Sequence, residues 1–230
     1  MIVETFQPAA CDVRAAVEAR DRFGILSPRH LDVILRGGIR GGTEGYVQCL
    51  VNAQVAGPTL TASTTPTSIL PPAARYNLPG NFFDKIGKAL RITVIGQLGN
   101  IVTTPGTFTP DVRMGPTSNI VVFNGGAIQL NAVAKTALPF WWDVLLTCRA
   151  IGNGTNANLM GQGRFQAESV VGSPLPASGG SGSLLTPATS PAVGTGFDST
   201  VGMVVDVFGT FSLNNANAIT VQQYFLESLN

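Results

Sequence analysis

Residues 140–150 show the clearest alternation of apolar and polar positions in the chain. One face would carry Phe140, Trp142, Val144, Leu146, Cys148 and Ala150, and the other Trp141, Asp143, Leu145, Thr147 and Arg149. An apolar face opposite a mixed face predicts a β-strand with one side against a core. Both tryptophans of the chain lie here, so we expect this strand at the centre of the apolar packing.

The rest of the C-terminal two-thirds repeats this pattern in shorter segments. The predicted strands are 90–98, 107–114, 119–123, 127–130, 159–170, 204–213 and 219–229. Pro110 predicts that 107–114 is an edge strand. The turn at 124–126 predicts that its two flanking strands pair with each other. We expect the last strand in mid-sheet. About eight strands separated by turn residues predict an all-β fold, an antiparallel jelly roll or β-sandwich over residues 81–230.

Residues 1–80 have a different texture, and we interpret them as an N-terminal arm and connector. Asp12 is a candidate N-cap for a short helix over 13–23, which Gly24 would end. Residues 46–55 could form a strand. Residues 56–78 are rich in Gly, Pro, Thr and Ser and predict an extended connector that buries little. Deleting residues 1–79 should therefore leave a folded β domain that has lost its attachment.

The composition indicates a protein that works in an assembly. Only 12% of residues are charged while 44% are hydrophobic, so other chains would cover part of the apolar surface. Eleven arginines against three lysines favour paired or interfacial guanidinium groups. The net charge is +1 without a basic run, which predicts no nucleic-acid partner. Without a signal peptide or about 18 consecutive apolar residues, we expect no membrane partner.

Candidate reactive residues are few. The three cysteines, Cys11, Cys49 and Cys148, are far apart, so we expect no disulfide framework and interpret Cys148 as a core residue. The single histidine, His30, has no neighbouring ligand set for a metal. The two Gly-Gly pairs in 36–43 lack the Lys-Ser or Lys-Thr of a phosphate-binding loop.

Two carboxylates raise an enzymatic alternative. Asp143 and Asp206 each lie in an alternating strand, and a pair on one face could act as a glycosidase couple. The simpler expectation is that each faces solvent or pairs with an arginine such as Arg149 or Arg91. We therefore predict no enzyme activity, no catalytic, cofactor-binding or metal-binding residues, and no cofactor.

Residues 172–196 form a long Gly-, Ser-, Pro- and Thr-rich segment. Loops of this length inside a domain tend to be binding loops or mobile surface. The segment contains neither an aromatic nor a charged residue, which argues against stacking on a sugar.

Residues 88–230 resemble a group of virion proteins of tailed bacteriophages. The resemblance rests on six segments: Lys88-Ala-Leu-Arg-Ile-Thr, Thr104-Pro-Gly-Thr, Asp111-Val-Arg-Met-Gly, Trp142-Asp-Val-Leu-Leu-Thr-Cys-Arg, Met160-Gly-Gln-Gly-Arg-Phe and Phe225-Leu-Glu-Ser. It implies a jelly-roll domain, often trimeric, on the outside of a capsid or on tail structures.

The function implied by this resemblance is a capsid decoration (cement) protein. Such a homotrimer would bind the major capsid protein or other virion structural subunits, bury additional interface area and stabilise the head. It would be assembled in the host cytoplasm and reside in the virion. Two alternatives stay open: a tail, collar or baseplate structural protein, and a carbohydrate-binding or receptor-binding module.

Overall fold

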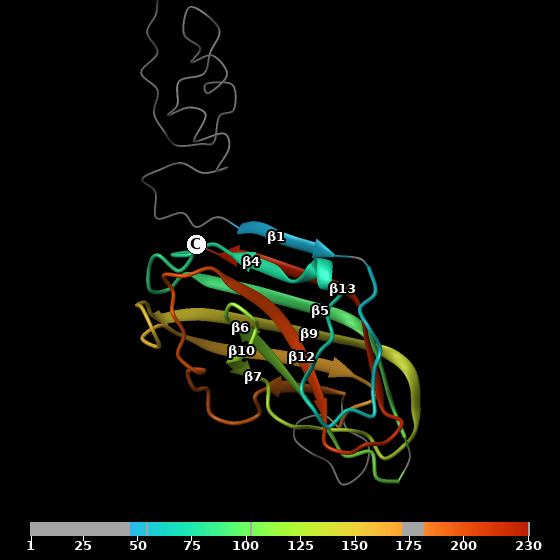
Figure 1. Ribbon diagram of the computed structural model, residues 1–230. Coiled ribbons are helices and arrows are strands. Elements are labelled where there is room, and N and C mark those ends of the chain that lie inside the picture. Colours follow the sequence, from blue (N-terminus) through green and yellow to red (C-terminus); the bar gives the residue numbers. More distant parts are fainter. Residues whose placement is uncertain (1–46, 54, 102, 172–181, 230) are drawn as a thin grey trace, which may run out of the picture. The chain divides into compact units, whose positions relative to one another are not determined.

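The computed structural model describes residues 47–53, 55–101, 103–171 and 182–229. They form thirteen strands and one 3-10 turn: β1 Val47–Ala53, β2 Leu60–Thr61, β3 Thr67–Ser68, η1 Pro72–Ala74, β4 Tyr76–Leu78, β5 Ala89–Asn100, β6 Thr107–Met114, β7 Ile120–Asn124, β8 Ile128–Gln129, β9 Lys135–Ala150, β10 Asn158–Ala167, β11 Ser183–Thr186, β12 Met203–Phe211 and β13 Ala218–Leu229 (Figure 1). No helix among the described residues is long and apolar enough to span a membrane.

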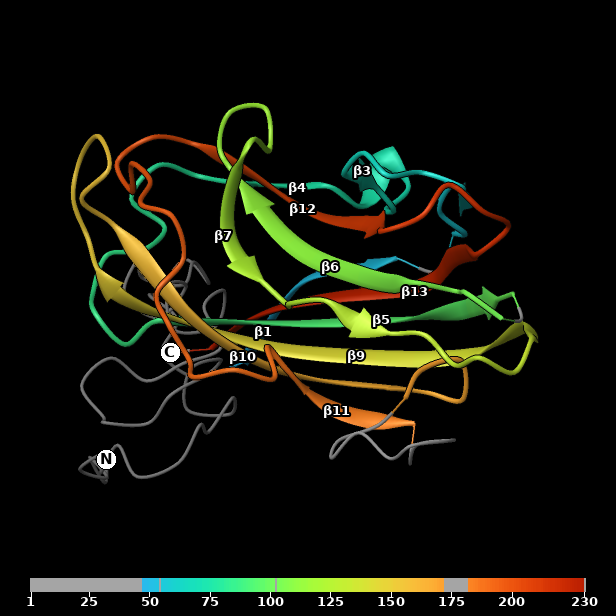
Figure 2. The same cartoon turned by 90° about the horizontal axis from the view of Figure 1, so that it is seen from below.

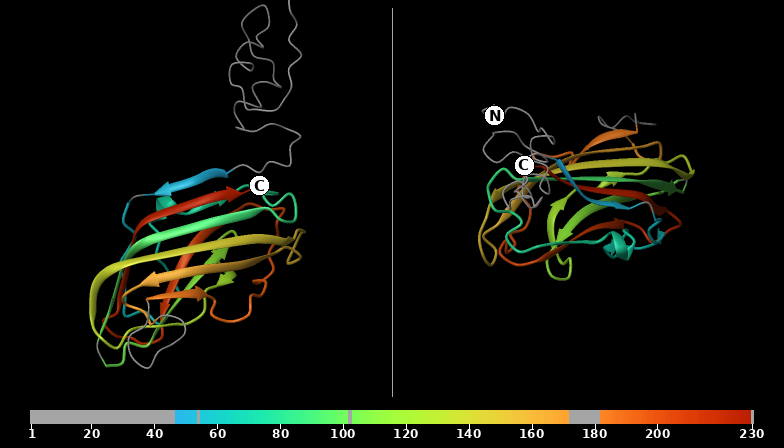
Figure 3. Two further views of the ribbon diagram at one scale, coloured as in Figure 1. Left: turned by 180° about the vertical axis from the view of Figure 1, so that it is seen from behind. Right: turned by 90° about the horizontal axis from the view of Figure 1, so that it is seen from above.

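The strands form two antiparallel sheets that face each other (Figure 2). The large sheet has the order β1-β13-β5-β9-β10-β11, and β2 also pairs with β13. These strands lie side by side in the left view of Figure 3. The small sheet has the order β3-β12-β6-β7, with β4 beside β12 and β8 beside β6.

Strands from the two ends of the described region are neighbours in both sheets. In the large sheet, β13 lies between β1 and β5, and in the small sheet β12 lies between β3 and β6. This interleaving of early and late strands is a jelly-roll arrangement. It confirms the predicted all-β sandwich, and it places the last strand in mid-sheet as expected.

β9 lies between β5 and β10 and carries the face predicted to be apolar. Phe140, Trp142, Val144, Leu146 and Cys148 on this face are all buried. The facing positions of β5, which are Leu90, Ile92, Val94 and Leu98, are also buried. The ring of Phe140 stacks on Phe165 of β10 at 5.5 Å between centroids. These side chains form one core between the sheets, and that core is the main source of stability.

The boundary expected near residue 80 is wrong, because the sandwich begins at residue 47. Residues 47–230 cluster as one compact unit. β1 pairs along its length with β13, and β4 pairs with Met203–Val205 of β12. Four residues of the expected connector, Leu60, Ile69, Leu70 and Leu78, are buried in the core. The backbone N–H of Ile69 donates to Val207 O at 3.0 Å, so partners in β12 order a segment that has no strong pattern of its own.

Two expectations for the small sheet also differ from the structure. β6 is internal despite Pro110, since it pairs with β12 on one side and with β7 and β8 on the other. The carbonyl of Pro110 accepts from Gly125 N, so the missing N–H points to the corner between β7 and β8 and removes no bond to β12. β7 and β8 each pair with β6 and not with each other.

A bulge in β13 changes which of its side chains face the core. The register with β5 shifts between Val221 and Gln223. Ile219 and Val221 are buried before the bulge, and Tyr224 and Leu226 are buried after it. Phe225, which strict alternation groups with Val221, therefore lies outward beside Thr93 of β5.

Candidate functional site

The face of the large sheet turned away from the core carries several exposed apolar side chains. Trp141 and Leu145 of β9 are 49% and 44% exposed, and Leu185 of β11 is 60% exposed. Ile95 lies directly opposite Trp141, and both residues are outward. We call the surface formed by Ile95, Trp141, Leu145, Leu185 and Phe225 the outer face. Large apolar groups gathered on one side of a sheet indicate a contact surface.

An ion pair between Arg91 and Asp143 lies in the middle of the outer face. Arg91 Nε and Nη2 donate to the two carboxylate oxygens of Asp143, each at 2.9 Å. Thr93 Oγ1 also donates to Asp143 Oδ1 at 2.9 Å. The Asp143 carboxylate raises the pKa of Arg91, chiefly through its hydrogen bonding with the guanidinium. Asp143 thus pairs with Arg91, as one of the sequence alternatives predicts, and its charge is compensated.

Asp206 lies on the other side of the sandwich, on the outward face of the small sheet. Its carboxylate accepts from Ser68 Oγ at 2.8 Å and lies 3.2 Å from Arg75 Nε. Burial raises the pKa of Asp206, although Ser68 and Arg75 oppose that shift. Asp143 and Asp206 therefore point away from each other on opposite faces and do not form a glycosidase couple.

A second acid–base pair lies next to Asp206. Arg113 Nε and Nη2 donate to the carboxylate of Asp111 at 2.7 and 3.0 Å, and the Arg113 guanidinium lies over the Phe208 ring at 4.4 Å. Arg113 itself is opposite Asp206 in the register of β6 and β12. The charges of the small sheet are thus largely matched within the fold.

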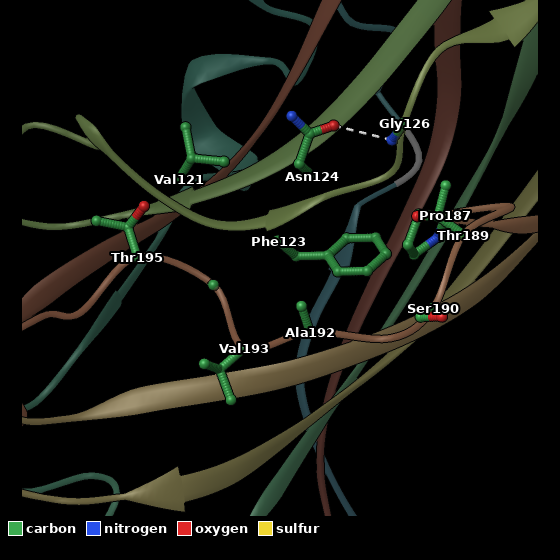
Figure 4. Close-up of a pocket in the computed structure, with 11 residues that line it drawn as sticks. Val121, Phe123, Asn124, Gly126, Pro187, Thr189, Ser190, Ala192, Val193 and Thr195 are labelled. Atoms are coloured by element: carbon green, nitrogen blue, oxygen red, sulfur yellow. Dashed lines mark hydrogen bonds between the residues drawn. The ribbon is translucent and has the colours of Figure 1, made fainter.

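A pocket of about 590 Å³ lies between β7 and residues 187–195, and we call it the β7 pocket. Val121, Phe123 and Asn124 line it from β7 (Figure 4). Residues 187–195 are held against both sheets. Thr195 N donates to Val121 O at 3.0 Å, and Gly194 N donates to Leu159 O at 2.9 Å.

The β7 pocket rests on a buried aromatic pair. Phe123 stacks on Trp142 at 6.2 Å between ring centroids, and Trp142 Nε1 donates to Thr186 Oγ1 at 3.0 Å. A Cβ at Gly194 would lie 1.8 Å from Val122 O, so only glycine fits this close approach to β7. The position of the pocket wall is therefore fixed by the packing of Phe123 on Trp142 and of Gly194 on β7.

The segment 172–196 is only partly the loop that its composition predicts. Residues 172–181 lie outside the described part of the chain, and Ser183–Thr186 form β11, which pairs with β10. Residues 187–195 line the β7 pocket. The buried ring of Phe123 of β7 lies beneath this wall, and no local sequence signal indicates that position, because it depends on packing between distant segments.

Cys148 is buried in the core as predicted, while Cys49 is exposed on β1. Among the described residues no group of three His, Cys, Asp or Glu side chains is close enough to hold a metal ion. The predicted helix over 13–23, Cys11, His30 and the Gly-Gly pairs of 36–43 lie outside the described residues.

Comparison with known proteins yields structural neighbours only. No family model matches the chain, and no curated protein matches it. The CBM2 module of the evolved Dit of Lactobacillus casei BL23 phage J-1 is 9% identical, covers 82% of this chain and 98% of its own, and has a TM-score of 0.34. Peanut lectin with a 9mer peptide is 8% identical over 84% of this chain and 95% of its own, with a TM-score of 0.32.

A third solved structure is a protein of unknown function from Shewanella oneidensis MR-1. It is 11% identical, covers 89% of this chain and 95% of its own, and has a TM-score of 0.31. At these identities the likeness concerns the fold alone, and nothing about function follows from it.

Proposed function

We propose that this chain is a non-enzymatic structural protein of a bacteriophage virion, and that it acts as a capsid decoration (cement) protein. In this role it forms a homotrimer and binds the major capsid protein or neighbouring virion subunits. The observation that carries the proposal is the outer face, where Trp141, Leu145 and Leu185 are exposed on one side of the large sheet.

Burial of the outer face against another protein would be favourable in free energy. Burying the exposed parts of these three side chains would contribute on the order of 1–2 kcal/mol each. The Arg91–Asp143 pair between them is already satisfied, so a partner that covers it leaves no charge uncompensated. Exposed aromatic and aliphatic side chains around a paired arginine are typical of subunit contacts.

The test is the occupancy of purified particles. The copy number of this chain relative to the major capsid protein, measured by quantitative mass spectrometry, should be stoichiometric or a simple fraction of it. A tail, collar or baseplate protein would be present in far fewer copies, which would shift the proposal to that alternative. Absence of the chain from purified particles would refute a virion role altogether.

Two variants test whether the outer face is the surface that binds the particle. Trp141→Glu should lower the copy number on particles strongly, because it places a charge in the proposed contact. Ile86→Glu is the matched control, since Ile86 is 64% exposed and lies outside the outer face. Equal loss of occupancy for both variants would show that the outer face is not the contact.

A further inference from the structure

The lining of the β7 pocket contains no charged side chain. From β7 come Val121, Phe123 and Asn124, and the opposite wall has Ala192, Val193, and three hydroxyl residues. A charged ligand would give up hydration here without a counter-ion to replace it. The pocket therefore selects for a neutral ligand.

Several polar groups of the pocket are without a partner in the described part of the chain. Asn124 Oδ1 accepts from Gly126 N at 2.8 Å, which fixes the amide and leaves its NH₂ group free to donate (Figure 4). The side-chain hydroxyls of Thr189, Ser190 and Thr195 also line the pocket. A wholly apolar ligand would strip water from these groups without replacing their hydrogen bonds.

The remaining lining is apolar. The Phe123 ring forms the floor of the pocket (Figure 4) and is only 3% exposed, and Val193 across from it is 48% exposed. The matching ligand thus has one C–H face for Val193 above the Phe123 floor, and hydroxyl groups on its rim for the amide and the hydroxyls. Sugar rings combine these two features without a net charge.

We propose that the β7 pocket binds a neutral saccharide, with Val193 against the sugar ring above the Phe123 floor and Asn124, Thr189, Ser190 and Thr195 at its hydroxyl groups. The volume of about 590 Å³ lies within the range of about 300–1,000 Å³ typical of small-molecule sites. This activity is separate from the outer face, because the pocket is built on β7 and residues 187–195 while the outer face belongs to the large sheet.

The experiment titrates the full-length chain with maltose, lactose, cellobiose and N,N′-diacetylchitobiose up to ~10 mM, followed by NMR or calorimetry. At least one of these disaccharides should bind and perturb the amide signals of Asn124 and Thr195. Glucuronic acid should bind more weakly, because the pocket offers no cation. Failure of all four disaccharides to bind would overturn the proposal, and so would tighter binding of glucuronic acid.

Two tryptophan substitutions locate the binding. Ala192→Trp should fill the β7 pocket and weaken the disaccharide at least about tenfold. Ala134→Trp is the matched control, since Ala134 is also exposed but lines a different pocket formed by residues of β5, β9 and β13. The control variant should bind as the natural chain does. Unchanged binding by Ala192→Trp, with its fold verified by circular dichroism, would contradict the proposal.

Discussion

Arg75 Nε lies 3.2 Å from Asp206 Oδ2, and this ion pair joins the segment after η1 to the middle of β12. Ser68 of β3 donates to the same carboxylate at 2.8 Å. Asp206 thus links β3 and the η1–β4 segment to β12 by side-chain contacts. The N-terminal part of the described chain is therefore integral to the fold.

A chain beginning at residue 47 should fold, and a chain beginning at residue 80 should not. The shorter form loses β1 to β4 and with them the buried side chains of Leu60, Ile69, Leu70 and Leu78. Each such loss costs about 2–5 kcal/mol, which together exceeds the stability of a typical domain. Thermal unfolding of residues 47–230 and 80–230 measures this, and a cooperative transition in the shorter form would contradict the assignment of β1 to β4.

Replacing Asp206 by Asn should change the pH dependence of stability. Burial raises the pKa of Asp206 in the folded state, so the folded chain holds this proton more tightly than the unfolded chain. The resulting stability is fully present below the unfolded pKa of about 3.9 and is lost as the pH rises through the folded pKa. Relative to Asp206→Asn, the natural protein should therefore lose stability from about pH 4 upward.

The measurement for Asp206 is the difference in Tm between the natural protein and the variant across the acid range. Asp84→Asn is the control, because the Asp84 side chain is 63% exposed and its ion pair with Lys88 is a surface contact. A difference in Tm that moved in the other direction with pH would show that the Arg75 pairing outweighs the burial of Asp206.

Thr186→Val should destabilise the fold by about 1–3 kcal/mol. The substitution preserves shape but leaves the buried indole N–H of Trp142 without the acceptor it now has at 3.0 Å. Thr147→Val, on the opposite face of β9, is the control and should have little effect. Urea unfolding followed by tryptophan fluorescence measures both, and equal stability of the two variants would argue against the Trp142–Thr186 bond.

Gly194→Ala should destabilise the wall of the β7 pocket by about 1–3 kcal/mol. Its Cβ would lie 1.8 Å from Val122 O, so β7 and residues 187–195 would have to separate. Gly202→Ala is the matched control, because the nearest atom to its Cβ would be 3.5 Å away. Denaturant unfolding compares the two, and a neutral Gly194→Ala would mean that this approach is looser than the geometry indicates.

The sequence predicts the regular part of this fold well, because long alternating strands carry their own signal. The limits of β6 are the predicted ones, and the buried face of β9 follows from period-two alternation. β2 and β3 are only two residues long, so their segment shows no periodicity. Ile69 is ordered instead by its bond to Val207, a partner far away in the sequence.

The candidate sites were harder to predict, because they depend on breaks in the pattern. The bulge between Val221 and Gln223 turns Phe225 outward, and no residue type in this segment predicts a bulge. The β7 pocket needs Phe123 from one strand and residues 187–195 from a distant segment. By contrast, the exposed side of Trp141 follows from alternation alone, since Trp142 takes the core side.

Trp141 and Trp142 allow a direct test of the central claim, that the outer face is buried by protein contacts in the virion. Hydroxyl-radical labelling with mass spectrometry reports the solvent access of each tryptophan in the free chain and in purified particles. Trp141 is 49% exposed in the free chain and Trp142 is 1% exposed, so Trp142 serves as an internal control. We expect strong protection of Trp141 in particles and no change at Trp142, and labelling of Trp141 that is equal in both states would contradict burial of the outer face.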